Sequence, residues 1–175
     1  MGVARPGLPD PAPADLAFEH HQWRVTGVYM LIADVLRGKT AGSTLATTTP
    51  SATVAELLDL LARFNVGALP VVDDEQQLVG IVSERDVVRR LHADESVLDA
   101  AVSTIMSSQV QTCEKDATVN ELMSIMTERR FRHVPVVEDG RLTGIVSIGD
   151  VVKSRMSELE FERDQLDHYV HTSQT

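Results

Sequence analysis

Two short segments with the same sequence pattern carry the side chains best suited to binding a ligand. Each reads Ser-x-x-Asp, with Ser83 before Asp86 and Ser147 before Asp150. Such a carboxylate accepts charge-assisted hydrogen bonds from the hydroxyl groups of a ligand. It also satisfies free amides where a helix begins, so the pattern equally describes a plain helix cap stabilised by the helix dipole. Both interpretations remain open.

The pair Arg132-His133 could supply cations that bind a phosphate group. Alternatively, it forms only a solvated basic edge on an acidic protein. These groups bind ligands and do not by themselves catalyse. The sequence shows no nucleophile beside a base and no glycine-rich loop that would cradle phosphates. We therefore expect a binding protein, not an enzyme, with no required cofactor.

The histidines and the cysteine do not follow a metal-binding pattern. His20 and His21 lie in a proline-rich N-terminal stretch, and the other four of the six histidines lack the spacing of metal ligands. The one cysteine, Cys113, has no partner for a disulfide or zinc site and is expected to pack as an inert apolar side chain. We expect neither a metal site nor a redox role.

An internal repeat determines where these side chains lie. The segment Ala-Thr-Val-Ala-Glu-Leu at 52–57 recurs as Ala-Thr-Val-Asn-Glu-Leu at 117–122, an offset of 65 residues. Pro-Val-Val recurs at the same offset, and Gly-Ile-Val-Ser recurs one residue earlier. A fixed offset indicates that one structural unit is used twice. The two copies span roughly residues 31 to 156.

Each copy predicts the same order of elements. Thr53 and Thr118 open Thr-x-x-Glu capping boxes, so a helix with one apolar stripe is expected behind each. Two apolar runs separated by a turn then predict a strand, a turn and a strand. These strands are expected at 69–72, 78–82, 134–137 and 142–146. A second helix follows each Ser-x-x-Asp segment.

This unit resembles the CBS domain, on its apolar-Pro-Val-Val strand and its Gly-Ile-Val-Ser-x-x-Asp junction between strand and helix. Two copies in tandem resemble a Bateman module of the stand-alone bacterial type. The resemblance implies an α/β fold of the α+β kind, in which two β-α-β-β-α motifs pack about a pseudo-twofold axis. It also implies clefts between the motifs for adenosine-containing ligands such as AMP, ATP, NAD or S-adenosylmethionine.

The resemblance implies ligand contacts at matching positions of both copies. The junction aspartate of the family accepts hydrogen bonds from a ribose diol, a role that falls to Asp86 or Asp150. Only the second copy places a basic pair before its proline, so we expect one occupied cleft, and the sequence leaves open which aspartate shares it. The expected ligand-binding residues are Thr47, Gly67, Ala68, Leu69, Pro70, Ser83, Asp86, Thr112, Arg132, His133, Val134, Pro135, Ser147 and Asp150. Of these, Thr47 and Thr112 belong to an expected first strand of each unit.

Charge and composition narrow the range of partners. A formal net charge of -10 argues against nucleic acid, and no apolar run is long enough to cross a membrane. We expect a cytoplasmic adenine-nucleotide sensor that forms a homodimer and acts on an unidentified protein target. The alternative is a scaffold of CBS domains that modulates a partner protein without binding a ligand.

The chain divides into four expected regions: a flexible tail at 1–28, motif 1 at 31–95, motif 2 at 96–156, and an amphipathic helix with the chain end at 157–175. The natural start could also be Met30. The last helix is expected to pack back on its own module or across a dimer. The dimer itself is expected to use the exposed helical faces, where Leu57, Leu58, Leu122 and Met123 have neighbours such as Leu60 and Ile125 that a single small module does not cover fully.

Overall fold

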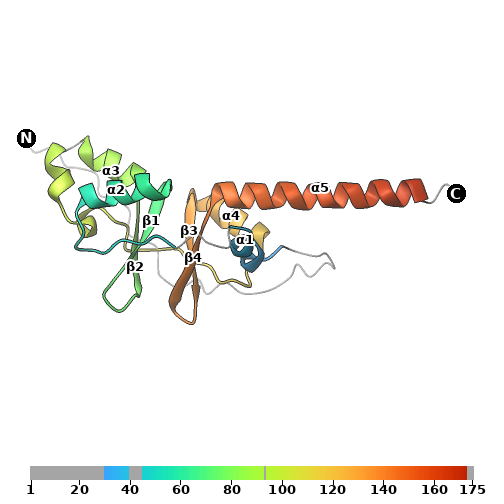
Figure 1. Cartoon of the computed structure of the whole chain (residues 1–175), viewed down its shortest axis with the longest axis horizontal. Helices are drawn as coiled ribbons and strands as arrows, with labels where there is room; N and C mark the ends of the chain where they lie inside the picture. Colours follow the sequence, from blue (N-terminus) through green and yellow to red (C-terminus); the bar gives the residue numbers. More distant parts are fainter. Residues whose placement is uncertain (1–29, 40–44, 93, 173–175) are drawn as a thin grey trace, which may run out of the picture.

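A computed structural model describes residues 30–39, 45–92 and 94–172 of the 175-residue chain. Two units of similar build lie side by side, with their hairpins next to each other near the middle of the molecule (Figure 1). The tail expected at 1–28 lies outside the described residues. The mixture of helices and small antiparallel sheets confirms the predicted α+β fold class.

The first unit contains α2 (Val54–Phe64), β1 (Ala68–Val72), β2 (Leu78–Ser83) and α3 (Glu84–Leu91). Strands β1 and β2 pair antiparallel, with Ala68 opposite Ser83. Two short 3-10 helices, η1 (Glu95–Asp99) and η2 (Val102–Thr104), lead to the second unit.

The second unit repeats this order with α4 (Val119–Arg129), β3 (His133–Glu138), β4 (Arg141–Ser147) and α5 (Ile148–Thr172). Strands β3 and β4 pair in the matching register, with His133 opposite Ser147. The four predicted strands are confirmed. So are the helices expected after the capping boxes and after the Ser-x-x-Asp segments.

Both predicted capping boxes form. The Thr53 amide donates to Glu56 Oε2 at 2.8 Å, and the Glu56 amide donates back to Thr53 Oγ1 at 3.2 Å. Thr118 and Glu121 make the same two bonds at 2.8 and 3.2 Å. Each box satisfies two amides that would otherwise have no partner in the first turn of a helix.

The first strand expected in each unit is reduced to a single bridge. Thr48 pairs parallel with Val71, and Cys113 pairs parallel with Val136. Thr48 donates to the Pro70 carbonyl at 3.0 Å and accepts from the Val72 amide at 2.9 Å. In the first unit the pairing ends there because the chain turns at Pro50, which has no amide hydrogen to extend it.

Each unit has its own apolar core. Leu57 of α2 and Leu122 of α4 are 0% and 1% exposed, so they fill these cores and are not available to the expected dimer surface. Their neighbours Leu58 and Met123 are half-buried.

The helix that precedes the first unit belongs to the core of the second. Helix α1 (Ile32–Gly38) places Ile32 and Val35 among the buried residues of the second unit. Its backbone joins the start of α4, where Val119 donates to the Met30 carbonyl at 3.0 Å. The expected first motif at 31–95 includes α1, whereas the structure packs this helix into the core of the second unit.

The segment between the units mirrors that arrangement. Leu31 bridges to Thr118, and Ala101 bridges to Thr53 in the same antiparallel manner. Each segment that leads into one unit therefore completes the other.

Helix α5 runs without a break through the expected boundary at 156 and 157. It begins at the second Ser-x-x-Asp junction and then extends away from both units (Figure 1). Met156, Leu159 and Phe161 are 57%, 48% and 65% exposed. This part of the helix therefore does not pack back on its own module as one expectation had it.

Candidate functional site

The two Ser-x-x-Asp segments form the same local structure at the ends of β2 and β4. Asp86 Oδ2 accepts hydrogen bonds from the Ser83 amide at 2.9 Å and the Ser83 hydroxyl at 2.5 Å. Asp150 Oδ2 accepts from the Ser147 amide at 2.7 Å and the Ser147 hydroxyl at 2.5 Å. Both carboxylates are half-buried. Each aspartate thus closes a helix cap and still presents its second oxygen.

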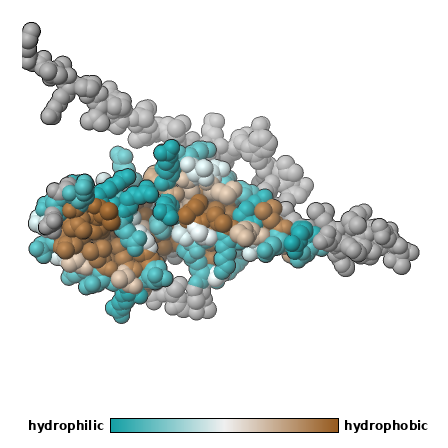
Figure 2. Space-filling model, turned by 90° about the horizontal axis from the view of Figure 1, so that it is seen from above, coloured by the Kyte–Doolittle hydropathy of each residue, from teal (hydrophilic) through white to brown (hydrophobic). Residues whose placement is uncertain are grey.

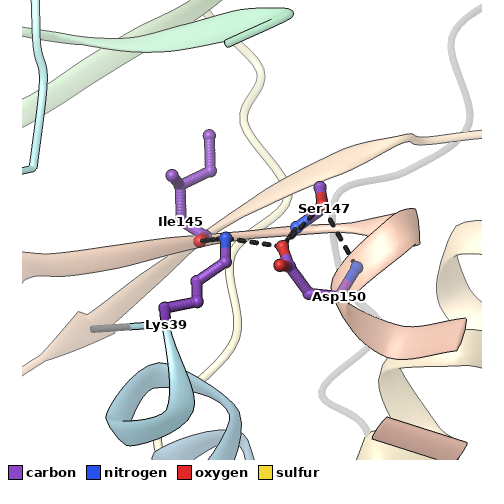
Figure 3. A network of polar contacts seen from close by, with 4 residues as sticks. All are labelled: Lys39, Ile145, Ser147 and Asp150. Atoms are coloured by element: carbon purple, nitrogen blue, oxygen red, sulfur yellow. Dashed lines mark hydrogen bonds and ion pairs between the residues drawn. The ribbon is translucent and has the colours of Figure 1, made fainter. Parts of the chain in front are cut away.

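A lysine distinguishes the second junction from the first. Lys39 Nζ lies 2.5 Å from Asp150 Oδ2 and donates to the Ile145 carbonyl at 2.8 Å (Figure 3). In the described part of the chain no cation pairs with Asp86. The equivalent carbonyl of the first unit, on Ile81, accepts instead from the Ser107 amide at 2.9 Å.

The position of Lys39 follows from the docking of α1. Its amide closes the last turn of the helix by donating to the carbonyls of Val35 and Leu36. Leu36 packs over Gly144, where a Cβ would lie only 2.7 Å from Leu36 Cδ2. The absence of a side chain at residue 144 therefore brings α1 close to β4, within reach of Asp150.

The charge balance keeps Asp150 ionised. Burial alone would raise the pKa of Asp150, but hydrogen bonds from Lys39 and Ser147, together with the charge of Lys39, hold it below its ordinary value of 3.8. The site thus presents a carboxylate with a resident counter-ion.

His133 lies where the two units meet. A Cβ atom on Gly67 of the first unit would be 3.4 Å from His133 Cε1 and 3.8 Å from Glu84 Oε2. Burial, followed by the charges of Arg132 and Lys39, lowers the pKa of His133 below 6.5, although Asp150 and Glu84 act in the opposite direction. The imidazole is therefore neutral at neutral pH.

The other predicted site residues fall into two groups. Ala68, Leu69, Pro70, Val134 and Pro135 are buried in the hairpins, so their backbone groups alone are placed to meet a ligand. Arg132 is exposed and precedes β3, and Thr112 is half-buried beside the Cys113 bridge.

Thr47 lines a separate cavity. This space of about 350 Å³ lies between the turn of the first hairpin and the start of β4, and Arg141 of the second unit also lines it. None of the other predicted ligand residues borders it. A larger hollow of about 470 Å³ is an open groove along α5, lined by residues that include Val152 and Met156.

Sequence reasoning missed Lys39. It lies outside the repeated pattern, 111 positions before the aspartate that it contacts, as the residue numbers show. To find it, one would have had to know that α1, which precedes the first unit in sequence, packs against the second.

The described residues contain no group of three His, Cys, Asp or Glu side chains positioned to hold a metal ion. No helix in this part of the chain combines the length and apolar character needed to cross a membrane.

Comparison with known proteins agrees with the repeated architecture. The family model of the CBS domain matches residues 42–93 and 102–157, which is more than half of the chain. The CBS domain-containing protein CBSX3 of Arabidopsis thaliana, named as mitochondrial, is 35% identical over 146 residues. That match covers 79% of this chain and 71% of the relative.

Solved structures show the same fold. The CBS-domain containing protein ATU1752 of Agrobacterium tumefaciens is 40% identical, with a TM-score of 0.68, over 72% of this chain and 99% of that one. CBSX2, solved in complex with AMP, is 27% identical, with a TM-score of 0.61, over 73% of this chain and 97% of that one. Two matched CBS units, each with its Ser-x-x-Asp junction, place the chain in the CBS-domain family as a tandem, or Bateman, module.

Proposed function

We propose that this protein is a regulatory module that binds an adenine nucleotide where its two CBS units meet. The observation that carries the proposal is the position of Asp150. Its ionised carboxylate lies with Lys39, and its charge acts on His133, which faces Gly67 of the first unit. A hydroxyl acceptor and cations therefore lie together at a boundary between two units, which is the composition that a nucleotide requires.

In this proposal Asp150 accepts the ribose hydroxyls and Ser147 holds the carboxylate in place. Arg132 supplies a phosphate cation from the exposed end of β3. The electrostatic influence of Asp150 on His133 supports placing the basic pair with Asp150, the question that the sequence left open. Thr112 remains a proposed contact for another part of the ligand, and Thr47 a proposed contact in the separate cavity that it lines.

The AMP complex of CBSX2 supports an adenine nucleotide as the ligand. AMP, ATP and NAD all present a ribose and a phosphate, so each fits the groups at Asp150. Binding at a boundary favours one relative position of the two units over others, and a protein target would respond to that shift. We propose such a regulatory role, without catalysis, in the cytoplasm.

The apolar surface supports a homodimer. Figure 2 shows apolar side chains gathered over the first unit and again near the beginning of α5. Exposed residues in these regions are Phe64, Val88, Leu91, Val152 and Met156. A second copy of the chain, or the protein target, would cover such surface. Light scattering at micromolar concentration tests the dimer, and a monomeric mass would contradict it.

The ligand proposal is tested first on unmodified protein. Native mass spectrometry of the purified chain should show an added mass that corresponds to an adenine nucleotide, and calorimetry should measure its affinity. If AMP, ATP and NAD all fail to bind, the proposal is wrong and the ligand-free scaffold takes its place.

Two matched variants then locate the site. Asp150→Asn keeps the shape and an acceptor for the Ser147 amide but removes the charge, so AMP affinity should fall about ten- to a hundredfold. Asp86→Asn makes the same change at the other junction and should alter AMP affinity far less. Equal losses in the two variants would contradict a single dominant cleft.

A further inference from the structure

The ion pair between Lys39 and Asp150 affects how a ribose can reach the second junction. Asp150 Oδ2 accepts from the Ser147 amide, the Ser147 hydroxyl and Lys39. A carboxylate oxygen accepts about two hydrogen bonds, so three donors already saturate Oδ2, and the ammonium also neutralises the charge that would attract the hydroxyls of a ribose diol. The diol therefore competes with Lys39 for the Asp150 carboxylate, and its charge-assisted hydrogen bonds reach full strength only after Lys39 withdraws.

The withdrawal costs binding energy because the pair is partly shielded from water. The Lys39 side chain is 31% exposed and the Asp150 side chain 22%. Lys39 loses its counter-ion when a ribose replaces it, and a neutral ligand such as adenosine offers nothing in return. A ligand with a phosphate on the same ribose offers a new anion to the released ammonium.

The anchoring of α1 limits where the ammonium can move. The backbone of Lys39 is held by Val35 and Leu36 at the end of a helix docked in the second core. The side chain therefore swings about a fixed point beside β4. His133 is neutral at neutral pH, so Arg132 and Lys39 are the cations that a phosphate can meet here, and the ammonium of Lys39 is not committed to a second carboxylate in the described structure.

We propose that Lys39 is a specificity-determining residue of the second CBS unit: it occupies the ribose acceptor in the empty protein and transfers to the phosphate of an arriving nucleotide. The cleft at Asp150 then selects adenosine ligands that carry a phosphate and rejects adenosine itself. The first junction has no such lysine and does not make this selection. This inference rests on the proposed binding of an adenine nucleotide at Asp150.

The test compares AMP with adenosine by calorimetry on the full chain, in an Asp86→Asn background that weakens binding at the first junction. Lys39→Met removes the ammonium and keeps a chain of similar length. Adenosine should then bind about tenfold more tightly and AMP about tenfold more weakly, because Asp150 has lost its counter-ion and the phosphate has lost one of its cations. Lys39→Arg should restore most of the preference for AMP.

Lys115→Met is the matched control. Lys115 belongs to the same unit and pairs with Glu138 at 2.6 Å, away from the junction. It should change neither affinity. Thermal melting of all variants verifies that they are folded.

The outcomes separate the two proposals. If the starting protein binds AMP and Lys39→Met retains its ratio of AMP to adenosine affinity, the role of Lys39 is refuted and nucleotide binding stands. Tighter adenosine binding with unchanged AMP binding also refutes the transfer to phosphate. If the starting protein binds neither ligand, both proposals fail. An inverted preference that Lys39→Arg restores supports the inference.

Discussion

Gly67 of the first CBS unit lies against the imidazole of His133 in the second, with only 3.4 Å between His133 Cε1 and the position of a Cβ on residue 67. The two residues precede or begin equivalent strands, so the contact links corresponding parts of the repeat. His133 is consequently half-buried where the units meet, and its protonation becomes coupled to their packing.

His133 should make the folded protein sensitive to mild acid. Its pKa is held below the ordinary value of 6.5 by burial and by Arg132 and Lys39, against the opposing charges of Asp150 and Glu84. The unfolded chain therefore takes up this proton more readily than the folded one. The contribution of His133 to the free energy of unfolding is therefore fully present above pH 6.5, and it is lost as the pH falls below that value.

Thermal melting of the unmodified protein and of His133→Gln between pH 7.5 and 5 would measure this contribution. The neutral variant should lose less stability over that interval. Parallel melting curves for the two proteins would show that His133 does not contribute to the acid sensitivity.

The repeat explains why so much of the fold could be predicted. Thr53 and Thr118 mark helix starts by a local rule, and the hairpins follow from apolar runs interrupted by turn residues such as Gly140, whose φ is +75°. These signals act over a few neighbouring residues. They therefore survive in a single sequence without any knowledge of long-range packing.

The site could be predicted only in part, because its charges come from distant segments. Asp150 was visible through its junction, but its partner Lys39 lies on α1, which precedes the other unit. Nothing in the local sequence of α1 indicates that it packs with the second core. The first strand of the first unit was overestimated for the opposite reason, since its threonines favour a strand while Pro50 stops it locally.

Thr48→Val should stabilise the protein. Thr48 is 4% exposed and its hydroxyl has no hydrogen-bond partner, so folding removes that group from water without compensation. Valine has the same shape without the hydroxyl, and the free energy of unfolding should rise by about 1 kcal/mol. Denaturant unfolding measures the change.

Thr143→Val is the matched control for that substitution. The Thr143 hydroxyl donates to the Val136 carbonyl at 3.3 Å, so its removal should lower stability slightly. An increase in both variants would indicate that valine stabilises these strands for general reasons, independent of an unpaired hydroxyl.

Cys113 should be almost unreactive in the folded protein. Burial raises the pKa of its thiol to about 11, so very little of the nucleophilic thiolate is present near neutral pH. Iodoacetamide at pH 8 should label Cys113 about a hundredfold more slowly than it labels the same residue in denaturant. Equal rates in the two conditions would show that the thiol is readily accessible.

Ile32→Ala should destabilise the second CBS unit, although residue 32 precedes the first in sequence. Ile32 is fully buried in the second core, and its truncation leaves a cavity where α1 docks. The free energy of unfolding should fall by about 2 to 5 kcal/mol. Arg37→Ala, at an exposed position of the same helix, should change it by no more than about 0.5 kcal/mol.

Because the docking of α1 also carries Lys39 to Asp150, Ile32→Ala should raise the pKa of the Asp150 carboxyl toward its ordinary value, as followed by NMR. A large loss of stability with an unchanged Asp150 titration would mean that Lys39 reaches the junction without the helix.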